Sequence, residues 1–111
     1  MKKADKNLLS GSTTLLVLSL LSSGDKYGYE RIAELEARSD HTFTLKEGTL
    51  YPILHGLEAD GLVTVREKAA ETGRMRKYYR ITKKGLKMLE EKKAEWSFFA
   101  EKVNAVICST V

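Results

Sequence analysis

The sequence predicts a mainly helical α+β fold, and three observations support this prediction. Three segments in the first half of the chain carry apolar side chains at the spacing of an α-helix. Two strand-like segments then flank a turn at Thr72-Gly73, which is the pattern of a β-hairpin. A long helical pattern closes the chain. Three short helices followed by a hairpin form a winged helix-turn-helix, here with one long additional helix at the C-terminus.

The composition fits one folded domain. The chain has 111 residues, of which 42% are hydrophobic and 31% are charged, and these values are typical of a globular protein. Its longest apolar run, from Leu15 to Leu21, is far shorter than the ~20 residues of a membrane span. The basic start MKKADK raises the alternative of a signal peptide, but no clear cleavage site follows it. We therefore expect a cytoplasmic protein that does not bind a membrane.

The first two predicted helices differ in polarity. Residues 1–10 are polar and are expected to be loosely held. Ser12-Thr-Thr then offers N-cap residues for a helix through Leu21, which is apolar almost all round and should be buried on more than one side. The second helix, over residues 27–39, is more polar. The residues expected on its inner face are Tyr29, Ile32, Ala33 and Leu35.

The third predicted helix has an apolar stripe on one side and mostly small residues on the other. Thr44 and Glu47 have the spacing of a capping box, which predicts a helix start at about Leu45, and Gly61 is placed to end the helix. The inward stripe consists of Leu50, Ile53, Leu54 and Leu57. The outer side and its shoulders consist of Gly48, Thr49, Tyr51, Pro52, His55, Gly56 and Ala59.

Two of these outer residues should weaken the helix. Relative to Ala, Pro52 costs about 3 kcal/mol and Gly56 about 1 kcal/mol in a helix interior. A helix with small outward residues can approach another surface closely, so we interpret it as shaped for contact. The alternative is that Gly48 and Gly56 only allow close packing against another helix of the same chain.

The charge distribution predicts a surface that binds a polyanion. Between Arg66 and Lys87 the chain has nine Lys or Arg and two Glu, a balance of +7, whereas the whole chain carries +4. Such a concentration suits nucleic acid, although a solvated basic face is the alternative. We expect phosphate contacts from the hairpin and base contacts from the third helix. The residues expected to bind DNA are Tyr27, Thr49, Tyr51, Pro52, His55, Arg74, Arg76 and Lys77.

The last predicted helix indicates a homodimer. Strands are expected over residues 62–66 and 77–82, after which Thr82 caps a helix that runs to about Cys108. Apolar residues at alternating spacings of three and four form a coiled-coil-like seam along it, broken by Lys93. A monomer of this size cannot cover so much apolar surface, so part of it should meet a partner. The residues expected to form the dimer are Leu89, Trp96, Phe99, Val103 and Ile107.

Three stretches together resemble the PadR family of bacterial transcriptional regulators. They are GDKYGYERI (24–32), EGTLYPILHGLEADGLV (47–63) and GRMRKYYRITKKG (73–85), and the resemblance covers about residues 10 to 90. It implies a winged-helix DNA-binding domain over residues 1–83 and a single C-terminal dimerisation helix over residues 84–111, as in the small subfamily. It also implies a homodimer that represses genes by binding an operator in double-stranded DNA, with repression relieved by a small molecule or another signal.

Trp96, the single tryptophan, is a candidate for binding an effector. One hypothesis is that two Trp96 rings face each other across a dimer axis and sandwich a small planar aromatic ligand, because Trp96 lies near the middle of the last helix. The resemblance also points to relatives that stack planar compounds on a tryptophan at this distance after the hairpin. Ala100 would leave room for such a ligand, and Lys93 would disfavour a cationic one. The alternative is that Trp96 only fills the dimer seam.

The sequence does not predict an enzyme. His41, His55 and Cys108 have no metal-ligand spacing, and there is no HExxH motif or glycine-rich phosphate loop. One cysteine excludes an internal disulfide and a cysteine-based zinc site, so no cofactor is expected. Two alternatives remain open: a winged-helix module that binds proteins, and an autoregulator that responds to no ligand.

Overall fold

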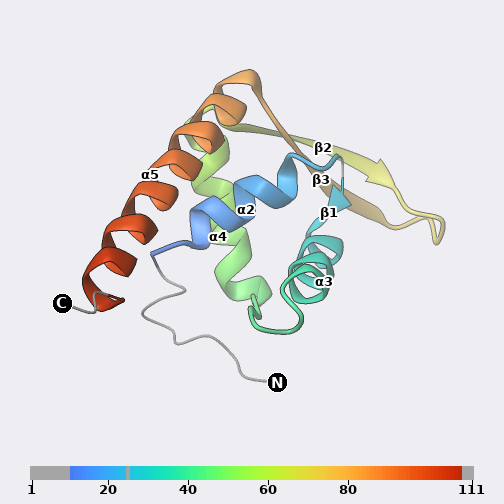
Figure 1. The fold of residues 1–111 in the computed structure, drawn as a ribbon. Helices are drawn as coiled ribbons and strands as arrows, with labels where there is room; N and C mark the ends of the chain where they lie inside the picture. Colours follow the sequence, from blue (N-terminus) through green and yellow to red (C-terminus); the bar gives the residue numbers. More distant parts are fainter. Residues whose placement is uncertain (1–10, 25, 109–111) are drawn as a thin grey trace.

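The computed structural model describes residues 11–24 and 26–108, so the prediction for residues 1–10 lies outside the described residues. The described chain contains four helices and three strands. Their order is α2 (Thr13–Leu21), β1 (Lys26–Tyr27), α3 (Gly28–Arg38), α4 (Glu47–Ala59), β2 (Val63–Ala69), β3 (Met75–Ile81) and α5 (Lys83–Ile107). Figure 1 shows α2, α3 and α4 grouped together, with α5 along one side and the β2–β3 hairpin extending away on the other. This arrangement confirms the predicted winged helix with a long C-terminal helix.

The hairpin belongs to a three-stranded antiparallel sheet with the order β1-β3-β2. β2 and β3 pair in register from Val63↔Ile81 to Ala69↔Met75, and the loop between them turns at Gly73, whose φ is +83°. A residue without a Cβ adopts this conformation most readily. β1 was not predicted. Its two residues are too few to show the alternation by which a strand is recognised in a sequence.

The core forms where the apolar faces of the helices meet the inner face of the sheet. The predicted stripe of α4 is confirmed, because Leu50, Leu54 and Leu57 are buried and Ile53 is partly buried. α2 is buried on more than one side, as expected for a helix that is apolar all round. The remaining buried apolar residues are Val17, Leu18, Leu20, Leu21, Leu35, Leu45, Leu62, Val63, Tyr79 and Leu89.

The predicted capping box of α4 is wrong, whereas its predicted end is right. The helix begins at Glu47, its N-cap is Lys46, and no side-chain hydrogen bond caps it. Leu45 is drawn into the core, which leaves the backbone extended through Lys46 and delays the first turn. At the other end the Leu62 amide donates to the Leu57 carbonyl at 2.9 Å, and Gly61 has a φ of +75°. These are the features of a Schellman cap.

The prediction for the inner face of α3 needs one correction. Ala33 is exposed, while the neighbouring Arg31 is 1% exposed and lies in the core. Its guanidinium donates to the carbonyls of Leu20, at the end of α2, and of Gly24, and it lies 3.4 Å from the Tyr79 carbonyl on β3. A buried cation is tolerated because these carbonyls replace its water and a Glu34 carboxylate oxygen lies 3.8 Å from its Nη1. Hydropathy alone could not distinguish it from a surface arginine.

α5 begins tightly against the rest of the domain. The Thr82 hydroxyl accepts a hydrogen bond from the Gly85 amide at 3.0 Å, which confirms the predicted cap. A Cβ at Gly85 would collide with the Leu62 carbonyl and the Ile81 side chain, so only glycine allows this approach. Gly85 and Leu89 are the buried residues of α5, and most of the helix beyond them is exposed. Within residues 11–24 and 26–108, no helix has the length and hydropathy needed to cross a membrane.

Candidate nucleic-acid interface

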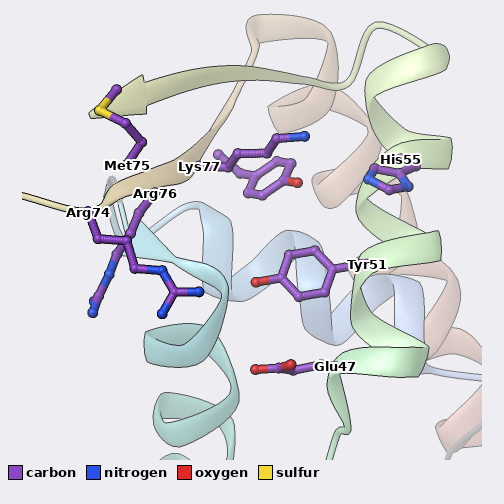
Figure 2. A pocket seen from close by; sticks show the side chains of 8 residues that line it. Glu47, Tyr51, His55, Arg74, Met75, Arg76 and Lys77 are labelled. Carbon is purple, nitrogen blue, oxygen red and sulfur yellow. The ribbon is translucent and has the colours of Figure 1, made fainter. Parts of the chain in front are cut away.

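A concave surface of about 610 Å³ lies between α4 and the hairpin, and we call it the α4–wing groove. Figure 2 shows Tyr51 and Glu47 extending from α4 toward the hairpin side, and Lys77 extending from the hairpin toward α4. The groove brings together five of the residues that the sequence predicted to bind DNA, from segments far apart in the chain. Its lining consists of Glu47, Tyr51 and His55 from α4, and Arg74, Met75, Arg76, Lys77 and Tyr79 from the hairpin.

The α4 wall of the groove is a row of polar side chains. Glu47, Tyr51 and His55 are four residues apart, so they lie above one another on the same side of the helix (Figure 2). Burial raises the pKa of the half-buried Tyr51 above 10, and the nearby charge of Glu47 raises it further. Tyr51 therefore stays a neutral hydroxyl at physiological pH, able both to donate and to accept a hydrogen bond.

Small residues next to this row leave the backbone of α4 approachable. Apart from the adjoining residues and the backbone of α4 itself, a Cβ at Gly48 or at Gly56 would meet no atom within 4 Å, so neither glycine serves close packing within the described chain. Thr49 and Pro52 are also exposed on α4, outside the groove lining, and the helix continues through Pro52. The face that the sequence interpreted as a contact surface is thus open in the folded chain.

The hairpin wall supplies the positive charge. Arg74 and Lys77 are exposed and Arg76 is half-buried. Lys77 stands opposite Glu67 across the strands, whereas Arg76 stands opposite Lys68. Like charges directly opposite one another destabilise a strand pair, so the pairing of Arg76 with Lys68 does not itself favour the hairpin.

Three residues of this region were not predicted as parts of the site. Met75 and Glu47 line the groove, and Glu47 could have been found because it precedes Tyr51 by one helical turn. Tyr79 lines the groove, but its hydroxyl is buried and forms no hydrogen bond with any described residue. Burial raises the pKa of Tyr79, and the charge that Tyr51 gains on deprotonation and the charge of Glu58 raise it further. The side chain of Tyr27, a predicted DNA-binding residue in β1, lies outside the described residues.

α5 carries a second exposed surface of a different kind. Trp96 is 51% exposed, and Phe99, Val103 and Ile107 are also exposed. The rings of Trp96 and Phe99 lie 6.2 Å apart between centroids, tilted by 33°. Leu89 was predicted to contact the partner, but it is 2% exposed and packs in the core of its own chain. Because the core of its own chain covers Leu89, a partner cannot reach it.

The two remaining residues of the predicted effector site lie on either side of Trp96. Lys93 is exposed and forms an ion pair with Glu90, with 3.2 Å between Nζ and Oε2. Ala100 is half-buried. Among the described residues, no three His, Cys, Asp or Glu side chains gather closely enough to hold a metal ion.

Comparison with known proteins gives the same classification of the chain. The sequence model of the transcriptional regulator PadR-like family matches residues 17–91. The transcriptional regulator YqjI of Escherichia coli is 33% identical over 95 residues, which are 86% of this chain but only 44% of YqjI.

Solved structures extend the likeness to nearly the whole fold. A transcriptional regulator from Clostridium thermocellum superposes with a TM-score of 0.82 at 34% identity, covering 89% of this chain and 96% of that one. A PadR-like transcriptional regulator from Bacillus cereus superposes with a TM-score of 0.80 at 35% identity, covering 94% of this chain and 99% of that one.

Proposed function

The chain belongs to the PadR-like family of transcriptional regulators, and we propose that it acts as a sequence-specific repressor that binds an operator in double-stranded DNA. The observation that carries this proposal is the α4–wing groove. One of its walls carries hydrogen-bonding side chains and the other carries cations. These are the two kinds of contact that recognition of duplex DNA requires, to base edges and to phosphates. A regulator with this role acts in the cytoplasm, where the chromosome lies.

In the proposed complex, α4 enters the major groove and the hairpin follows the phosphate backbone. Tyr51 and His55 contact base edges, together with Thr49 on the exposed side of α4. Pro52 is exposed on the same helix and projects little from it, which lets α4 come close to the DNA. Arg74, Arg76 and Lys77 contact phosphates. Because no arginine lines the α4 wall, the strong arginine-to-guanine pair is absent from this set of base contacts, and part of the specificity then depends on DNA shape.

We propose that the functional unit is a homodimer formed through α5. Trp96, Phe99, Val103 and Ile107 present apolar surface that nothing in the described chain covers, and burial against a second copy would remove that surface from water. A two-fold axis through α5 would present two copies of α4 to one side of the duplex. Their half-sites would then be about 34–36 Å apart, one helical turn of DNA.

The experiment that tests DNA binding measures its dependence on salt. Fluorescence anisotropy of a labelled genomic duplex, titrated at several salt concentrations, gives the slope of log affinity against log salt. We expect Arg76→Ala and Lys77→Ala each to weaken binding to all sequences and to reduce the slope by about one. Lys102→Ala, which removes the same charge from the far part of α5, should leave the slope unchanged. A module that binds proteins instead would show no binding at any salt concentration.

We further propose that a planar aromatic effector stacks on Trp96 and relieves repression. The half-exposed ring beside the small Ala100 supports this proposal, because stacking requires a π-face and few directional hydrogen bonds. Planar aromatic compounds should quench Trp96 fluorescence saturably, and Trp96→Ala should abolish their binding in calorimetry while the dimer persists. If no compound quenches the fluorescence and Trp96→Ala dissociates the dimer, Trp96 is part of the dimer seam and the regulator responds to another signal.

A further inference from the structure

Glu47 is an acid on the wall of a groove whose other charged residues are cations. We infer that Glu47 is a specificity-determining residue, whose carboxylate accepts a hydrogen bond from the N4 amine of a cytosine in the operator. This inference rests on the proposed DNA-binding function and adds to it the identity of one base contact.

The structure shows that Glu47 does not form a capping box, which is the ordinary role of a glutamate near the start of a helix. A capping box would occupy its carboxylate with a backbone amide, but α4 begins at Glu47 itself and has no side-chain cap. Glu47 is exposed, and within the described part of the chain no hydrogen bond or ion pair engages its carboxylate. The carboxylate is therefore available to a molecule that enters the groove.

The position of Glu47 is suited to base contact. A recognition helix contacts base edges with its N-terminal residues, and Glu47 is the first residue of α4. Its charge lies close enough to the Tyr51 hydroxyl to raise the pKa of that group. Glu47, Tyr51 and His55 follow one another along α4 (Figure 2). Their steps of about 6 Å would let each side chain reach a different base pair.

The negative charge restricts what Glu47 can contact. A carboxylate accepts hydrogen bonds and donates none, and phosphates repel it. In the major groove only cytosine N4 and adenine N6 offer an amine, and adenine places the acceptor N7 beside that amine. Cytosine presents its amine without such a neighbour on the same base. Glu47 thus weakens binding to any DNA sequence that does not place an amine opposite its carboxylate. Most random sequences lack that amine, so Glu47 discriminates against them.

Selection of binding sites from randomised duplexes, with the full-length protein, tests the inference. The wild-type motif should contain one cytosine position in each half-site that depends on Glu47. Glu47→Gln should lose discrimination at that base pair by about tenfold or shift it to adenine, whose N6 and N7 suit an amide. The same variant should bind random duplexes more tightly than the wild type does.

Glu58→Gln is the matched control. It removes the same charge from an exposed position on the last turn of α4, and Glu58 does not line the groove. It should leave the selected motif unchanged. The inference is overturned if Glu47→Gln selects the wild-type motif and gains no more affinity for random DNA than Glu58→Gln does. If the wild type itself selects no motif, the proposed function and this inference both fail. Circular dichroism confirms that each variant is folded.

Discussion

The exposed faces of α4 and α5 differ in chemistry. The outer face of α4 is small and polar, and it stands beside the cations of the hairpin. The exposed face of α5 is apolar and aromatic. α4 has already buried its leucine stripe within the domain, so its open face contributes little to folding. α5 leaves most of its apolar stripe uncovered. The difference indicates two partners, a polyanion for α4 and a second apolar surface for α5.

The largest expected effect comes from charging the α5 surface. We expect Val103→Asp combined with Ile107→Asp to dissociate the dimer, because the partner would have to bury two carboxylates. DNA affinity should fall at the same time, since two half-sites are no longer bound together. Sedimentation equilibrium at micromolar concentration measures the first effect, and anisotropy measures the second.

Ala105→Asp is the control for this pair, because residue 105 is on the opposite side of α5 from Val103. It should leave the dimer intact. If the wild-type protein is already a monomer at micromolar concentration, the interpretation of the α5 surface is wrong, and the apolar face must have another partner.

A smaller effect is expected from the polar row of α4. Tyr51→Ala or His55→Ala should lower the ratio of operator affinity to random-DNA affinity. The expected loss of discrimination is about 1–3 kcal/mol, the usual contribution of one side chain that hydrogen-bonds a base. Neither variant should change the dimer, because both residues line the α4–wing groove. Competition titrations of operator against random duplex measure the ratio. An unchanged ratio with a reduced salt slope would mean that these side chains bind phosphates.

Gly56→Ala separates stability from function on the same face. Apart from the adjoining residues and the backbone of α4 itself, no described atom lies within 4 Å of the added Cβ, so the substitution should stabilise the fold by up to about 1 kcal/mol through helix propensity. It should nevertheless weaken DNA binding if the backbone of α4 approaches the duplex closely. Thermal unfolding and DNA titration of the same preparation test both effects. Equal or tighter DNA binding would show that the small residue serves no close approach.

The smallest effect concerns the floor of the groove and appears only at alkaline pH. The pKa of Tyr79 is raised above 10, chiefly by burial. The folded protein therefore holds the Tyr79 proton more tightly than the unfolded chain does. This contribution to the free energy of unfolding is complete below the ordinary pKa of about 10, and it is lost as the pH rises through the higher pKa of the folded state. Tyr79→Phe should therefore reduce the alkaline loss of stability.

The same variant should also be more stable at neutral pH, by about 1 kcal/mol, because no described residue forms a hydrogen bond with the buried hydroxyl. Denaturant unfolding at pH 7 and at alkaline pH measures both quantities. Tyr78→Phe, on the opposite face of the same strand, is the control. A loss of stability at pH 7 would show that the Tyr79 hydroxyl has a partner after all.

The sequence by itself predicted the features that depend on local pattern. The leucine stripe of α4, the Gly61 and Thr82 caps, and the hairpin with its turn at Gly73 were all found in this way. Each of these depends on residues within a few positions of one another, where spacing and backbone preference determine the outcome. Several of the residues that the sequence predicted to bind DNA also lie together in one groove of the folded chain.

Tertiary contacts alone decided the rest. β1 forms by pairing with β3, and the carbonyls of Leu20, Gly24 and Tyr79 meet at the buried guanidinium of Arg31. Burial of Leu45 moved the start of α4 to Glu47 and left that carboxylate in the groove, while burial of Leu89 removed it from the surface offered to a partner. Local pattern shows which side chains are apolar, but the packing of distant segments decides which of them reach the core.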